Sequence, residues 1–99
     1  MDLQQLSASY AVRRLTEADI PAVLALQSAN PQFYRYHPPL PSEASIREDL
    51  SALPPEKTAA DKYYAGFFSG EQLIAVLDLI LGYPDAQTAF LGFFMTAAA

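Results

Sequence analysis

Residues 62–81 read KYYAGFFSGEQLIAVLDLIL, and this stretch decides the fold of the 99-residue chain. Two apolar runs, 62–68 and 73–81, are separated by Ser69-Gly70-Glu71-Gln72, which is typical of a β-hairpin turn. A third apolar run, residues 88–95, follows after a short turn that contains proline. Three consecutive strands joined by short turns predict an antiparallel meander. Because the hairpin runs are apolar at odd and even positions alike, we expect the sheet to be covered on both faces.

The segment before the hairpin predicts a strand and a helix. Residues 10–15 are short and partly β-branched, and Thr16 and Asp19 follow with the spacing of an N-terminal helix box. Apolar residues then recur at helical spacing until about residues 28–31, where the helix should end. Residues 31–42 are rich in proline and tyrosine, so we interpret them as an ordered loop rather than a helix or strand.

A second helix is predicted between this loop and the hairpin. Ser42 is placed to cap it, and Ile46, Leu50 and Leu53 form a narrow apolar stripe. Pro54 and the proline after it should stop the helix, and its charged residues should face water.

The predicted architecture is therefore α+β, in the order β-α-α-β-β-β, with an antiparallel sheet and two helices. We expect residues 1–9 to be a flexible tail, 10–95 to be the folded subdomain, and 96–99 to be a short tail. Two short helices cover only one face of such a sheet. The other face and the outer edge of 88–95 lack cover, so we expect either self-association through this strand or a missing C-terminal half. This strand carries no charge, and we expect Phe90, Phe93 and Phe94 to form exposed aromatic surface, so a lysine substituted at Phe93 should weaken the association.

Composition excludes several classes of protein. Hydrophobic residues make up 52% of the chain and charged residues 17%, which excludes general disorder. The net charge of -5 disfavours nucleic-acid binding. With no cysteine and one histidine, no metal site is expected. The amino terminus lacks the features of a secretion signal, and residues 86–99, the longest uncharged stretch, are too short to span a membrane, so we expect a soluble, cytoplasmic protein with no membrane partner.

The order of these elements resembles the GNAT-type N-acetyltransferases over residues 10–95. The resemblance rests on residues 13–20 (RRLTEADI), on the hairpin with the sequences KYYAGFF and LIAVLDL, on Gly82-Tyr83-Pro84-Asp85, and on residues 89–95 (AFLGFFM). Each fragment is short, and the specificity lies in their common order and spacing. The resemblance implies transfer of an acetyl group from acetyl-CoA to a primary amine.

The resemblance also implies a segment that this chain does not contain. Family members continue from the fourth strand into a loop of the form Arg/Gln-x-x-Gly-x-Gly/Ala, whose backbone N–H groups hold the pyrophosphate of acetyl-CoA. Residues 96–99 contain neither glycine nor a basic residue. We therefore expect the N-terminal portion of an acetyltransferase that is inactive alone and binds no acetyl-CoA. The alternative is a non-enzymatic interaction or dimerisation module.

Asp78 is the weak catalytic candidate, since a carboxylate within an apolar strand is costly unless it is paired or solvated. In a functional interpretation it accepts a proton from, or contacts, the acceptor amine. In a structural interpretation it pairs with Arg13, Arg14 or Lys62, or faces a wet groove.

Other candidates surround the cleft that the resemblance implies. Phe33, Tyr34 and Arg35 could contact the acceptor substrate, with Arg35 suited to a carboxylate, or the rings could simply cover the core, with His37 exposed. Tyr83 could line the same cleft or pack in its turn. The backbone of Phe94, Met95 and Thr96 falls where the family holds the pantetheine arm of the cofactor.

Overall fold

A computed structural model describes residues 2–36 and 38–97, which form one four-stranded antiparallel sheet in the order β1-β2-β3-β4. The strands are β1 (Ala11–Arg14), β2 (Lys62–Ser69), β3 (Gln72–Leu81) and β4 (Ala89–Thr96). The helices are α1 (Ile20–Ser28), α2 (Pro31–Tyr36) and α3 (Glu43–Ser51), with single 3₁₀ turns η1 (Leu3–Leu6), η2 (Glu17–Asp19) and η3 (Ala59–Asp61). The predicted α+β meander is confirmed.

The turn between β2 and β3 forms as its sequence predicts. Gly70 has a φ of +60°, a left-handed conformation that side chains with a Cβ rarely adopt. The register that follows pairs Tyr64 with Asp78 and Gly66 with Val76. Residues 62, 64, 66, 76 and 78 consequently share one face of the sheet.

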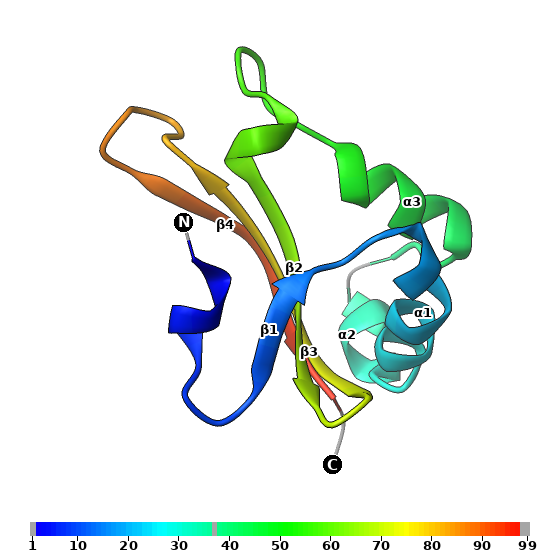
Figure 1. The fold of residues 1–99 in the computed structure, drawn as a ribbon. Coiled ribbons are helices and arrows are strands. Elements are labelled where there is room, and N and C mark those ends of the chain that lie inside the picture. Colours follow the sequence, from blue (N-terminus) through cyan, green and yellow to red (C-terminus); the bar gives the residue numbers. More distant parts are fainter. Residues whose placement is uncertain (1, 37, 98–99) are drawn as a thin grey trace.

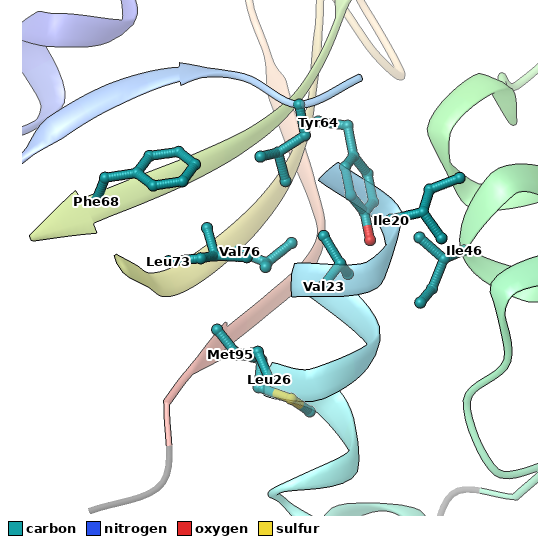
Figure 2. Close-up of a cluster of buried hydrophobic side chains, with 10 residues drawn as sticks. Ile20, Val23, Leu26, Ile46, Tyr64, Phe68, Leu73, Val76 and Met95 are labelled. Atoms are coloured by element: carbon teal, nitrogen blue, oxygen red, sulfur yellow. The ribbon is translucent and has the colours of Figure 1, made fainter. Parts of the chain in front are cut away.

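The three α-helices lie on one side of the sheet, and the 3₁₀ turn η1 lies on the other (Figure 1). On the helix-covered face, Ile20 and Val23 of α1 and Ile46 of α3 pack against Tyr64 and Val76 of the sheet (Figure 2). Ile46 and Val76 have no exposed surface, so this is where the core is densest.

Two helix boundaries differ from the sequence-based expectation. The expected loop at 31–42 begins with α2, because Pro31 occupies the first helical turn, where its missing N–H costs no hydrogen bond. The Phe33 N–H donates to the carbonyl of Asn30, 3.2 Å away. Helix α3 is capped by Ser42 as predicted but ends at Ser51, so Leu53 lies beyond the helix.

The expected flexible tail at residues 1–9 also differs, because its described part packs on the opposite face of the sheet. Asp2 caps η1, and Leu3 is buried in a second cluster with Val12, Tyr63 and Ala65. The Gln4 side chain ties the segment to β1 by accepting a hydrogen bond from the Val12 N–H at 3.0 Å. Burial of Leu3 is the physical reason that the segment is held there.

Strand β4 is exposed over most of its length. Phe90, Leu91 and Phe94 are 47%, 56% and 51% exposed. Phe93, in contrast, is half-buried on the helix-covered face, where its ring packs against Phe33 at 6.0 Å between centroids. The expectation that Phe93 forms part of the open apolar surface is therefore wrong, because the alternation along β4 turns its side chain toward the helices. Within the described ranges, no helix is both long and apolar enough to cross a membrane.

Candidate functional site

Asp78 forms an ion pair with Lys62 on the helix-covered face. The Lys62 ammonium donates to both Asp78 carboxylate oxygens, at 3.1 and 3.2 Å, and to the carbonyl of Ala52 at 2.8 Å. The side chains of Lys62 and Asp78 are 5% and 19% exposed. Ala52 is the C-cap of α3, so Lys62 also places a positive charge at the negative end of that helix. Of the partners considered for Asp78, the structure selects Lys62.

Three further polar side chains in this region interact electrostatically: Asp49 of α3, Tyr34 of α2 and Tyr64 of β2. Burial raises the pKa of the Asp49 carboxyl, and the negative charge of Asp78 raises it further. Burial likewise raises the pKa of the Tyr64 hydroxyl, followed by the charges of Asp49 and Asp78. Burial also raises the pKa of Tyr34 on α2, with Asp49 as the second cause. The charge of Lys62 acts in the opposite direction and lowers the pKa of Asp49.

A pocket of about 270 Å³ opens beside Asp78. Its lining combines the ion pair with apolar side chains of the loop after α3, of β3 and of β4: Ala52, Leu53, Pro54, Lys62, Asp78, Ile80, Tyr83, Phe90 and Gly92. The rings of Tyr83 and Phe90 meet edge to face, with centroids 5.6 Å apart. The pocket therefore has the Lys62–Asp78 ion pair on one side and an aromatic wall, formed by Tyr83 and Phe90, on another.

The loop between β3 and β4 holds Tyr83 in place. The Tyr83 N–H donates to the Thr88 carbonyl at 3.0 Å, and the Asp85 carboxylate accepts from the Gln87 N–H and the Thr88 hydroxyl at 2.9 and 2.8 Å. Lys57 donates to the carbonyl of Gly82 at 3.1 Å. These bonds order the turn, so the aromatic wall has a defined position.

Gly92 is an extra residue in β4 directly beside Asp78. Asp78 pairs with Phe93 and Leu79 pairs with Leu91, so the register shifts and leaves Gly92 unmatched. A Cβ atom on Gly92 would lie 3.6 Å from Asp78 Oδ2 and 3.5 Å from the Phe90 ring. Such bulges occur frequently beside active sites, where they redirect side chains. The absence of a side chain on Gly92 keeps the Asp78 carboxylate open to the pocket.

The predicted acceptor residues divide into two groups. Phe33 and Tyr34 lie edge to face at 4.9 Å, and Phe33 contacts Phe93, the strand partner of Asp78. Tyr83 lines the pocket directly. Arg35 does not line it; its guanidinium lies on the exposed side of α2, 5.8 Å from the Tyr36 ring centroid. His37 lies outside the described residues.

The end of β4 carries the residues expected to bind the cofactor through their backbone. Phe94, Met95 and Thr96 pair with Leu77, Val76 and Ala75 of β3. Since β4 is the last strand in the order of the described sheet, its other edge has no neighbouring strand there. The Thr96 carbonyl accepts from the Asn30 side chain at 3.2 Å, so this group is already engaged.

Of the nine residues that line this pocket, sequence reasoning named only Asp78 and Tyr83 as candidate site residues, and those it missed include Phe90 and Gly92. The isolated glycine in Phe90-Leu91-Gly92-Phe93 was the available signal, since a single glycine in a strand pattern suggests a bulge. The side of the strand on which the bulge opens depends on pairing with β3, which the local sequence does not encode.

The glycines of this chain do not fit the pyrophosphate of acetyl-CoA. Gly66 and Gly92 lie within strands, and Gly70 and Gly82 lie in or beside turns between strands. A pyrophosphate cradle needs glycine-flanked N–H groups at a helix N-terminus. None of the four glycines precedes a helix of the described chain.

Comparison with known proteins supports an acetyltransferase-like fold. No protein-family model matches the sequence, and no curated protein matches it. The structure is similar to the crystal structure of an acetyltransferase from Thermus thermophilus, with a TM-score of 0.75 and 22% sequence identity. The match covers 90% of this chain and 56% of that chain. The chain thus has an acetyltransferase-like fold and spans little more than half the length of that enzyme.

Proposed function

We propose that this chain is the N-terminal portion of a GNAT-type N-acetyltransferase that acts on a primary amine, and that it is inactive alone. The observation that carries the proposal is the pocket containing Asp78, on a fold similar to that of an acetyltransferase. The overall reaction joins the amine nitrogen to the acetyl carbon and releases the thiol of coenzyme A. The acceptor must lose a proton before its nitrogen can attack.

The chain's own residues would act on the acceptor amine. Asp78 accepts a hydrogen bond from the amine and can take its proton, while Lys62 holds the carboxylate in place from the opposite side. Phe33 is linked to this region by its ring contact with Phe93. Tyr34 is linked to it by the charge of Asp49, which raises the pKa of the Tyr34 hydroxyl. The outer edge of β4 at Phe94 and Met95 is the segment that we propose for the pantetheine arm.

The first test is the coding DNA immediately after the codon for Ala99. An open frame that encodes a Gly-x-Gly segment would support the proposal, and the longer protein should then transfer acetyl groups to primary amines. Release of free thiol from acetyl-CoA measures this activity. A stop codon at this position would favour the alternative below.

The second test is calorimetric titration of the 99-residue chain with acetyl-CoA. We expect no binding at micromolar concentration, because the glycines do not form a pyrophosphate cradle and the net charge is -5. A dissociation constant in the micromolar range or tighter would contradict the proposed inactivity of the isolated chain.

The second candidate function is a dimerisation module, and the exposure of Leu91 and Phe94 on β4 favours it. An uncharged edge strand beside exposed apolar side chains is suited to pairing with another strand. Two copies could join their β4 edges about a two-fold axis. Light scattering at micromolar concentration should then detect a dimer or larger species, and a stable monomer would count against this function.

A further inference from the structure

We infer that the pocket beside Asp78 selects a primary amine attached to a flat apolar group, such as an arylalkylamine. This inference rests on the proposed function, since it names the acceptor class of the same site. It goes further by assigning specificity to Tyr83, Phe90 and Gly92. Three features carry it: the unused hydrogen-bonding capacity of the ion pair, the composition of the wall, and the opening at the bulge.

Hydrogen-bonding capacity favours a cation over an anion. The Lys62 ammonium has three N–H groups, and the Ala52 carbonyl and both Asp78 oxygens accept from it. A ligand carboxylate or phosphate would therefore find no free donor on Lys62. A carboxylate has about four acceptor positions, and in the described part of the chain only Lys62 donates to Asp78. The remaining acceptor positions suit the N–H groups of an ammonium.

The charges around the pair point the same way. The charge of Asp78 raises the pKa of Asp49, and the charges of both carboxylates raise the pKa of Tyr64. Asp49, Asp78 and Lys62 together carry one net negative charge when both carboxylates are ionised. A ligand ammonium would neutralise this charge.

The wall of the pocket favours a flat apolar body beside the ammonium. Leu53, Pro54 and Ile80 present apolar surface, and Tyr83 and Phe90 add two aromatic rings. An aromatic ligand can join an edge-to-face pair, and the ring faces attract an adjacent cation. The volume of about 270 Å³ lies just below the range of pockets that enclose drug-sized ligands, so one ring on a short arm is the matching size.

Gly92 controls the approach of the ligand to the carboxylate. Its missing side chain leaves open the position 3.6 Å from Asp78 Oδ2 where a Cβ would lie. A larger side chain at this position would occupy the space between Phe90 and Asp78. Gly92 is thus a specificity-determining residue without contributing any polar atom.

The test is binding of phenethylamine to the 99-residue chain without acetyl-CoA, followed by backbone amide NMR. We expect saturable shifts at residues 78–83 and 90–92. The neutral analogue 2-phenylethanol should bind at least about tenfold more weakly, because its hydroxyl can donate to the carboxylate but brings no positive charge to neutralise it. Ethylamine, which lacks the ring, should also bind more weakly.

Matched variants locate the site. Gly92→Val should weaken phenethylamine binding by about tenfold or more through loss of the ammonium contact, while Leu91→Val, one residue away, should leave binding unchanged. Asp78→Asn should remove the preference for phenethylamine over 2-phenylethanol. Circular dichroism shows which variants fold, and the Gly92 variant keeps the test decisive if Asp78→Asn unfolds.

Equal affinity for phenethylamine and 2-phenylethanol, no saturable binding, or an unchanged affinity in folded Gly92→Val would each overturn the inference. Failure of the proposed function has a different signature. In that case phenethylamine binds as expected, but the protein translated beyond Ala99 releases no thiol from acetyl-CoA in its presence.

Discussion

The two faces of the sheet have similarly apolar sequences but very different surroundings. Three α-helices cover the face that carries Tyr64 and Val76 (Figure 1). On the other face, the described chain supplies the single turn η1, whose Leu3 packs near Val12 and Tyr63. The region of β4 around Leu91 and Phe94 remains exposed. The comparison teaches that alternation identifies a strand with two apolar faces, whereas the cover on each face depends on the segments that pack there.

The largest expected effect is the difference in unfolding free energy between a substitution on the covered face and one on the open face. Ile46→Ala should lower the free energy of unfolding by about 2 to 5 kcal/mol, because the residue has no exposed surface and its removal leaves a cavity. Leu91→Ala on the other face should change it by about 0.5 kcal/mol or less. Urea denaturation of both variants measures the difference. Equal losses would show that the two faces are equally well packed.

The second prediction concerns the ion pair on the covered face. Asp78→Asn should lower the free energy of unfolding by about 1 to 3 kcal/mol, because it leaves the buried Lys62 ammonium without its counter-charge. The double variant Lys62→Met with Asp78→Asn should recover part of this loss. Equal urea midpoints for Asp78→Asn and the unmodified chain would show that the carboxylate contributes little and is free for function.

The third prediction tests whether the open face drives association. Phe94→Lys should weaken self-association by at least about tenfold, equivalent to about 1.4 kcal/mol, because it charges an exposed apolar position. Ala18→Lys in η2 adds the same charge at an exposed position away from β4 and serves as the control. Sedimentation equilibrium measures both. Equal effects would assign the change to net charge rather than to β4.

The smallest expected effect comes from the ion pair between Arg13 of β1 and Asp19 of η2. Hydrogen bonds from Arg13, at 2.8 and 2.9 Å, lower the pKa of Asp19 from 3.8 to about 2. Because the pKa of Asp19 is lower in the folded state, its ionised carboxylate stabilises the fold at pH values above the unfolded-state pKa. This contribution is lost as the pH falls from about 3.8 to about 2. Because Arg13 is 53% exposed, solvent screening reduces the contribution to about 1 kcal/mol.

Asp19→Asn therefore should cost about 1 kcal/mol at pH 7 and almost nothing near pH 2. Urea unfolding at several pH values measures the difference between the variant and the unmodified chain. A difference that stays constant across this range would mean that the Arg13 pair does not depend on the charge of Asp19.

Sequence reasoning predicted the elements better than the site. The hairpin turn at Gly70, the capping residue Ser42 and the meander of β2, β3 and β4 follow from local signals, and all are present. Helix α2 was missed because a proline-rich segment was interpreted as loop, although Pro31 suits a first helical turn. The contact of Leu3 with β1 and β2 was missed because a short amino-terminal segment carries no periodic signal.

The candidate site was identified only at Asp78 and the aromatic residues around it. Asp78 was conspicuous because a carboxylate interrupts an apolar strand, but three basic residues were possible partners. Lys62 lies 16 residues away in sequence, and the register of β2 on β3 brings it to the carboxylate. Arg35 was grouped with Phe33 and Tyr34 because they are neighbours in sequence, yet it is exposed on the short helix α2 and does not line the pocket.

The sequence by itself determined the meander, the two apolar faces and the Ser42 cap of α3, because turns, alternation and caps act over a few residues. Only the tertiary structure decided that Lys62 neutralises Asp78, that Gly92 opens β4 beside the carboxylate, and that Phe93 and Phe94 lie on opposite sides. The physical reason is strand register. A shift of one residue between neighbouring strands moves every side chain to the other face, and this choice depends on packing across the whole sheet.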